Sequence, residues 1–337
     1  MVLRTARLLA IWPGLLLSMG VAALAAGVEW AEVTLSGHRW IDGLVLAILF
    51  GTGIHTAFGL DPRFRAGVNF AAKIVLELAV VALGATISGA AILGSGAPLL
   101  AAIVVVVVVA LGASYAIGRL VGLNRRQAVL VACGNSICGN SAIMAAAPVI
   151  EAKAEDVAAS IGFTAVLGIL VVLLLPGTLL LLDLSAGQYG IVAGLSVYAV
   201  PQVLAATAQT GPVSSQIATV VKLVRVLMLG PVVLVLGLIT GRRQRRRVAP
   251  GLLVPWFIIG FLVLMLLRSA GALPQGAIDL LGVVSGHLTL VAMAALGLSV
   301  DLRSIVAAGG KVLLAGSLSI AMLVTLALIA VAVLPPI

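Results

Sequence analysis

The chain has 337 residues, of which 62% are hydrophobic and only 9% are charged, and its mean hydropathy is +1.28. A soluble domain cannot bury that much apolar surface, because hydrophobic cores stop growing with chain length, whereas a bilayer offers hydrocarbon as the solvent. The net charge of +9 does not indicate nucleic-acid binding, because the basic residues lie between apolar segments, most of them in alternate loops. The composition predicts one all-α polytopic membrane domain over residues 1–337.

Eleven apolar segments are candidate membrane spans, since a span needs about 20 residues. In chain order they are Leu8–Ala26, Gly43–Leu60, Ala71–Ser88, Ala97–Gly118, Ala128–Ile150, Val157–Leu182, Tyr189–Ala208, Val213–Thr240, Leu252–Leu267, Ala277–Leu298 and Val312–Leu334. Residues 1–26 have a second interpretation as a signal peptide, because basic residues and an apolar run precede Ala23-Leu24-Ala25. We expect a retained span, because this apolar run is long for a signal peptide.

The loop charges predict the orientation, because Lys and Arg collect on the cytoplasmic side. With eleven spans, one face holds Arg4, Arg7, Arg63, Arg65, Arg119, Arg125, Arg126, the run Arg242–Arg247, Arg303 and Lys311, and the other holds Glu29, Glu32, Asp42, Glu151, Glu155 and Asp156. We therefore expect an inner-membrane protein with its N-terminus in the cytoplasm and its C-terminus outside. The run Arg242–Arg247 is expected to anchor the topology on anionic lipid.

A short internal match suggests an inverted repeat. Ala82-Leu83-Gly84 recurs as Ala295-Leu296-Gly297, seven spans later, so the two copies would have opposite orientations. Inverted repeats are typical of secondary transporters. The alternative is coincidence, since Ala, Leu and Gly are common in this chain.

The segment Cys133–Ala142, which reads CGNSICGNSA, places a polar tandem inside an apolar span. It begins roughly 10 Å beyond Arg126 at 1.5 Å per residue, which is near mid-bilayer. Irregular backbone at that depth is tolerated only when it is buried in protein or lines a watery cavity. We therefore predict a discontinuous helix, restarted by Asn140 and Ser141 as N-caps, whose positive end suits an anion. The alternative is a continuous helix in which Gly, Ser and Asn mediate packing.

A second interruption is expected at Ser196–Gln202. Pro201 removes a backbone donor, and Tyr198 and Gln202 lie one turn apart, where they could face the same cavity. An ordinary proline kink is the alternative.

Charged residues inside the spans predict the chemistry. Lys222 and Arg225 lie mid-span on one helix face, where an unpaired charge costs at least about 2.5–3.5 kcal/mol. Glu77 is the expected protein partner, so a positive excess remains that favours an anionic substrate. The alternative is a structural Lys–Glu pair that joins two helices. His287, also mid-span, is either a proton relay or a packing residue.

The stretches Ala132–Gly168, Ser215–Val233 and ALGLSVDL from Ala295 resemble the YeiH-type sulfate exporter family, and the resemblance extends over nearly all of the chain. That family is similar in fold to bile-acid transporters and cation–proton antiporters, which implies inverted repeats, discontinuous crossing helices and a core that moves against a scaffold. The resemblance implies that Cys133–Ser141 is one crossing point and that Lys222 and Arg225 are the family's basic pair. One departure is Val197-Tyr198-Ala199, where many relatives carry an Ile-His-Asp/Glu-like motif, so proton coupling would move to Glu77 or His287.

The leading hypothesis is a secondary transporter that exports a small oxyanion, such as sulfate, sulfite or a sulfonate, by alternating access. The predicted substrate-binding residues are Asn135, Ser136, Gly139, Asn140, Ser141, Tyr198, Gln202, Lys222 and Arg225, and the predicted coupling residues are Glu77 and His287. Protons or sodium are the candidate coupling ions, membrane lipids the expected surroundings, and a homodimer is left open. A cation–proton antiporter using Glu77 and a non-transporting scaffold subunit are the alternatives. No P-loop, GxSxG or HExxH motif occurs, and Cys133 and Cys138 lack zinc spacing, so we expect no enzyme activity, cofactor or metal.

Overall fold

The computed structural model describes residues 2–37, 41–87, 96–240, 256–301, 303 and 310–334, and every regular element within these ranges is helical. The all-α prediction is therefore confirmed for this part of the chain. The chain divides into two compact units, Met1–Ala90 with Phe257–Arg303 (unit 1) and Ala91–Trp256 with Ser304–Ile337 (unit 2). The prediction of a single membrane domain stays a prediction, and the basic run Arg242–Arg247 lies outside the described residues.

Unit 1 contains α1 (Val2–Ser36), α2 (Gly43–Phe58), α3 (Pro62–Phe70), the π-helical turn η1 (Ala71–Val75), α4 (Leu76–Gly84), α16 (Trp256–Ser269) and α17 (Gln275–Leu298). Both Ala-Leu-Gly copies lie here, and each glycine allows close helix contact. A Cβ atom on Gly84 would lie 2.4 Å from the Phe261 carbonyl oxygen, and one on Gly297 would lie 2.3 Å from that of Ile48. Small residues at helix contacts are typical of membrane bundles.

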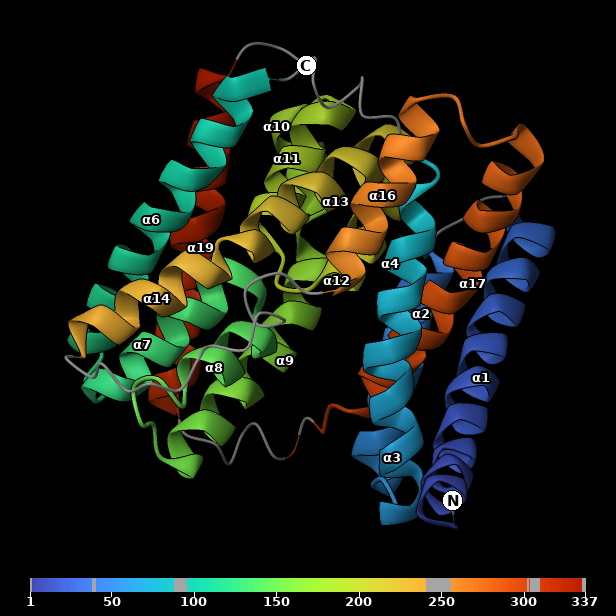
Figure 1. The fold of residues 1–337 in the computed structure, drawn as a ribbon, viewed down its shortest axis with the longest axis horizontal. Helices are drawn as coiled ribbons and strands as arrows, with labels where there is room; N and C mark the ends of the chain where they lie inside the picture. Colours follow the sequence, from blue (N-terminus) through green and yellow to red (C-terminus); the bar gives the residue numbers. More distant parts are fainter. Residues whose placement is uncertain are drawn as a thin grey trace. The chain divides into compact units, whose positions relative to one another are not determined.

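Unit 2 contains α6 (Gly96–Leu120), α7 (Arg125–Cys133), the π-helical turn η2 (Gly134–Cys138), α8 (Asn140–Ala146), α9 (Ala154–Leu174), α10 (Gly177–Leu182), α11 (Ala186–Ser196), α12 (Val200–Thr207), the short 3₁₀ turn η3 (Ala208–Thr210), α13 (Pro212–Leu227), α14 (Leu229–Ile239) and α19 (Gly310–Val333). Helices α6 and α19 lie side by side, and α14 continues the line of α13 (Figure 1).

Seven helices within the described residues are long and apolar enough to cross a membrane: Ala10–Ser36, Pro62–Gly84, Gly96–Leu120, Ala154–Leu179, Pro212–Ile239, Gln275–Leu298 and Gly310–Val333. Two shorter apolar helices, Gly43–Phe58 and Trp256–Ser269, accompany them. The predicted count of eleven is not confirmed. Two of the predicted spans, Ala128–Ile150 and Tyr189–Ala208, have a different structure from the one expected.

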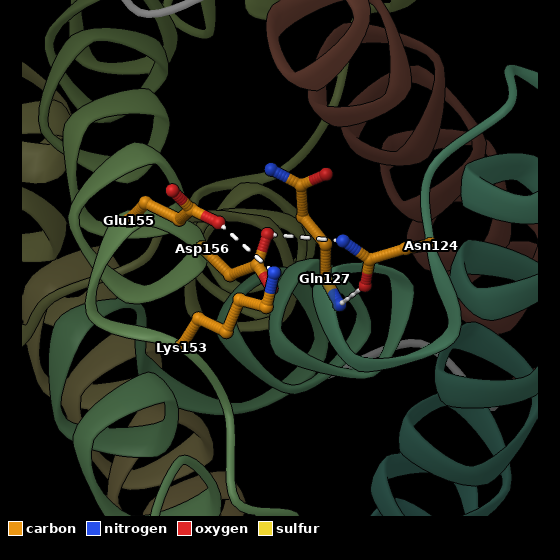
Figure 2. Close-up of polar contacts among 5 residues, drawn as sticks. All are labelled: Asn124, Gln127, Lys153, Glu155 and Asp156. Carbon is orange, nitrogen blue, oxygen red and sulfur yellow. Dashed lines mark hydrogen bonds and ion pairs between the residues drawn. The ribbon is translucent and has the colours of Figure 1, made fainter.

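The first of these segments folds back on itself as a hairpin of α7, η2 and α8. Asn124, at the start of α7, donates a hydrogen bond of 3.0 Å from Nδ2 to Asp156 Oδ1, in the first turn of α9 (Figure 2). A Cβ atom on Gly134 would lie 2.9 Å from Ile143 Cδ1 of α8, nine residues onward in sequence. A straight helix would place those residues about 13 Å apart. The chain therefore enters with α7 and returns with α8.

The second segment is a hairpin of α11 and α12. The hydroxyl of Tyr189, near the start of α11, donates a hydrogen bond of 2.7 Å to the carbonyl of Ala206, near the end of α12. Gly190 and Gly194 of α11 contact Ser214 and Ala218 of α13, respectively, so these two helices run parallel. That direction requires α12 to bring the chain back to the level at which α11 began.

The prediction that Ala128–Ile150 and Tyr189–Ala208 are each a single through-span is therefore wrong, because each segment returns to the end of unit 2 at which it began. Helix α9 runs from the open end of the first hairpin toward the open end of the second. The two hairpins therefore enter unit 2 from opposite ends, and their tips meet inside it. The hydrogen bond between Asn124 and Asp156 also places residues 151–156 at the same end of unit 2 as Arg125, not at the opposite face. Lys153 and Glu155, which form an exposed ion pair of 3.4 Å, lie at this end too (Figure 2).

Candidate functional site: two hairpin tips around a basic pair

The tip of the first hairpin is formed by η2 and Gly139. The π-helical turn closes with a hydrogen bond of 2.8 Å from the Gly139 N–H to the Gly134 carbonyl. Gly139 has φ = +65°, a conformation that glycine adopts without steric cost, and the chain reverses at this residue. Gly139 is also the N-cap of α8, so the prediction that Asn140 and Ser141 cap this helix is wrong. The predicted interruption itself is confirmed.

The tip of the second hairpin is the extended segment between Ser196 and Val200. Helix α11 ends at Ser196, and α12 starts at Val200 with Pro201 in its first turn, where a missing N–H costs no hydrogen bond. Gln202 Oε1 accepts a hydrogen bond of 3.2 Å from the Ala199 N–H and so stabilises the start of α12. The interruption is confirmed, but it precedes the proline and is not a kink at it.

Arg225 of α13 joins the two tips. Its Nε and Nη2 donate to the carbonyls of Ser136 (3.2 Å) and Asn135 (3.1 Å) in the first tip. Its Nη1 donates to the carbonyls of Gly194 (2.9 Å) and Val197 (3.2 Å) in the second. The side chain is completely buried. These four carbonyls lie where the first helix of each hairpin ends, so they lack the N–H donors that a continuing helix would supply. One guanidinium therefore provides donors to the ends of both helices.

Lys222 makes the same kind of connection one turn earlier in α13. Its ammonium nitrogen donates to the carbonyls of Ile137 (2.6 Å) and Val197 (2.9 Å), and the side chain is also fully buried. Both cations bind backbone carbonyls of unit 2, so the expected role of Glu77 as their partner is not needed. Lys222 lies ten residues beyond Pro212, about 15 Å along α13, which is half the thickness of a bilayer core.

A buried network of hydrogen bonds, centred on Asn135, fixes the first tip to neighbouring helices of unit 2. Asn135 is fully buried, and its Nδ2 donates to Ser114 Oγ (3.0 Å) and to the carbonyl of Ser319 (3.2 Å). Its Oδ1 accepts from the Tyr198 hydroxyl (3.1 Å), so a side chain of the second tip completes the network. Asn135 and Tyr198 therefore hold the two tips together, and neither is exposed to a solute.

Asn140 and Ser141 differ from the other predicted binding residues because their side chains are exposed. They lie at the start of α8, just past the reversal at Gly139, and Asn140 Oδ1 accepts a hydrogen bond from the Thr164 hydroxyl of α9. By contrast Ser136 and Gln202 are buried, and Gln202 packs against Gly168. The structure thus brings all nine predicted binding residues to the two tips and exposes two of their side chains.

Comparison with known proteins places this architecture in a family. Residues 13–316 match the family described as conserved hypothetical protein 698. A UPF0324 membrane protein of Brucella melitensis is 54% identical over 92% of this chain and 87% of its own length. The corresponding values are 51%, 92% and 90% for one of Agrobacterium fabrum, and 32%, 88% and 86% for one of Bacillus cereus. The chain belongs to the UPF0324 membrane protein family.

Membership of UPF0324 establishes a membrane protein, and the names of these relatives state no substrate. No solved structure matches this UPF0324 protein. The resemblance to YeiH-type sulfate exporters and the predicted likeness to bile-acid transporters therefore stay predictions.

The two predicted coupling residues of this UPF0324 protein lie in unit 1, and their role stays a prediction. Glu77 is half-buried in the first turn of α4. His287 is exposed on α17, and its Nδ1 lies 2.8 Å from the Val283 carbonyl of the same helix.

Sequence reasoning missed the residues that support the tips. Ser114, Thr164 and Ser319 come from α6, α9 and α19, and isolated Ser and Thr residues carry no distinguishing signal in apolar helices. The Asn124–Asp156 bond was also missed. The acidic charges beside Lys153 were assigned to the other face only because the hairpin was counted as a span.

Proposed function

We propose that this UPF0324 protein is a secondary active transporter that exports a small oxyanion, such as sulfate, sulfite or a sulfonate, by alternating access across the bacterial inner membrane. The observation that carries the proposal is the meeting of two hairpin tips at a fully buried pair of cations. Discontinuous helices that meet near mid-bilayer are the usual framework of a solute site in secondary transporters.

The electrostatics of the tips favour an anion over a cation. A helix C-terminus carries roughly half a negative charge, so the two carbonyl ends compensate about one of the two positive charges of Lys222 and Arg225. About one positive charge is left, because within the described residues the hydrogen-bond partners of the two cations are backbone carbonyls and none is a carboxylate. Helices α8 and α12 begin at the tips and add positive potential. In a low-dielectric site this field lowers the energy of an anionic solute.

Asn140 and Ser141 are the residues that we expect to touch the solute. Their exposed amide and hydroxyl groups can donate hydrogen bonds to an oxyanion. The other predicted residues would not touch the solute but would fix the backbone of the tips and supply the positive field. They are Asn135, Ser136, Gly139, Tyr198, Gln202, Lys222 and Arg225. The same field disfavours cation–proton exchange at the tips, and the interrupted hairpins are not the continuous fifth helix expected of a scaffold subunit.

The test is transport by the purified protein in liposomes, with sulfate, sulfite and a small sulfonate as labelled solutes. We expect saturable flux above empty liposomes, and a loss of at least tenfold in Asn140→Ala. The matched control is Thr325→Ala, an exposed residue of α19 whose hydroxyl donates to the Ala321 carbonyl of the same helix, and this variant should keep full flux. Equal flux in Asn140→Ala and the unsubstituted protein would refute the assignment of the site, and sodium- or potassium-dependent proton movement without anion flux would favour the antiporter.

A further inference from the structure

Five backbone carbonyl oxygens converge between the hairpin tips. Those of Asn135, Ser136 and Ile137 come from the first tip, and those of Gly194 and Val197 come from the second. Clustered carbonyl oxygens are the ligands of hard cations, and unwound backbone in other secondary transporters coordinates coupling cations in this way. Here the nitrogen atoms that meet the oxygens, at 2.6–3.2 Å, belong to the protein itself.

We propose that Lys222 is a tethered counter-ion that permanently fills a cation site between the two tips, so that the protein needs no free cation there, and that truncating this side chain turns the position into a site for a small primary ammonium ion. Lys222 is thus a positioning residue that holds both tips through their carbonyls. The inference does not rest on the proposed transport of anions, because it concerns only how the tips are held.

The geometry favours Lys222 over Arg225 as the exchangeable cation. An ammonium group is a compact point charge with three donors, which a free ion can reproduce, whereas the planar guanidinium bridges four separate carbonyls. Without Lys222, the Val197 carbonyl keeps its bond from Arg225, and the Ile137 carbonyl is left unpaired and buried. Because Lys222 is fully buried, truncation to alanine leaves a cavity the length of the missing stem, which a short alkylammonium ion can fill, so ethylammonium is the first probe.

The test measures the melting temperature of the purified protein in detergent at constant ionic strength, with choline chloride replaced stepwise by ethylammonium, sodium or potassium chloride. Choline has no N–H donor and is the reference. We expect Lys222→Ala to melt several degrees below the unsubstituted protein and to regain at least half of that loss, saturably, in ethylammonium. Lys222→Met should melt low and stay low, because its side chain fills the cavity that truncation to alanine opens. Lys311→Ala, an exposed lysine of α19, should not change the melting temperature.

Two results would overturn the inference. One is a Lys222→Ala variant whose melting temperature is the same in ethylammonium and in choline. The other is a saturable stabilisation of the unsubstituted protein by sodium or potassium, which Lys222→Met abolishes, because it would show that a free cation binds the tips beside Lys222. The titration of the unsubstituted protein decides the question alone if Lys222→Ala does not fold: a flat response supports the inference.

Discussion

Replacing Arg225 with methionine removes the guanidinium that joins the tips and keeps a long apolar stem. Three carbonyls, those of Asn135, Ser136 and Gly194, lose the donor that Arg225 provides, while the Val197 carbonyl retains Lys222. A buried polar group left unpaired costs about 1–3 kcal/mol, so the three together cost roughly 3–9 kcal/mol. Burying the methionine stem and removing a buried charge offset part of this cost, so we expect a net loss near the lower bound, about 3 kcal/mol.

A loss of about 3 kcal/mol is a large fraction of the stability of a folded protein and corresponds, for a chain of this length, to a melting temperature lower by roughly 4 °C. The assay is the fraction of protein that stays monodisperse in size-exclusion chromatography after heating. Arg225→Lys should lie between Arg225→Met and the unsubstituted protein, because an ammonium keeps the charge but cannot reach four carbonyls at once. The control is Arg125→Met at an exposed site, expected to change stability by no more than about 0.5 kcal/mol.

The reasoning fails if Arg225→Met melts at the same temperature as Arg125→Met. In that case the carbonyls would find other donors, and the guanidinium would not be what holds the tips. A lower melting temperature for both variants would show instead that any loss of positive charge destabilises the protein.

Three further predictions concern the hairpins. Gly194→Ala should lower the melting temperature markedly, because its Cβ would lie 2.6 Å from the Ala218 carbonyl oxygen, while Gly286→Ala, whose Cβ meets nothing within 4 Å, should be neutral or slightly stabilising in the same thermal assay. Tyr198→Phe removes one hydrogen bond between the tips and leaves the Asn135 amide oxygen without its donor, so we expect a loss of about 1–3 kcal/mol in the same assay. Single cysteines in place of Arg125 and Glu155 should react with a membrane-impermeant maleimide from the same side of the membrane, because both flank the Asn124–Asp156 bond; labelling from opposite sides would restore the crossing topology.

The helical spans could be predicted from the sequence, because apolar length is a direct consequence of bilayer thickness. The direction of the chain within a span could not. Helices α7 and α8 have nine and seven residues, and joined through η2 they match the length of one ordinary span. A hydropathy profile shows one apolar segment of this length whether the chain continues or reverses at Gly139. The acidic residues at 151–156 were then assigned to the wrong end, because the alternation of loops depends on counting each crossing correctly.

The candidate site was predicted in part for a similar reason. Two cations in apolar surroundings require partners, so the meeting of Lys222 and Arg225 with the interrupted backbone could be expected from the sequence. The nature of the partners could not, because sequence reasoning looks for a carboxylate and found Glu77. Backbone carbonyls are present at every residue, and only the fold determines which of them lose their helical N–H donors.

The two hairpins also separate the polar residues into two roles. At each tip the chain supplies one carbonyl end, where the first limb stops, and one amide end, where the second limb begins. Among the described residues, Lys222 and Arg225 are bonded only to the carbonyl ends, so the positive amide ends are not neutralised by these contacts. The exposed polar side chains, Asn140 and Ser141, lie at one of those amide ends. A buried residue of the tips is therefore expected to change stability when it is replaced, whereas Asn140, which accepts one hydrogen bond from Thr164, is expected to change transport far more than stability. A variant of Asn140 that lost stability but kept its flux would contradict this separation.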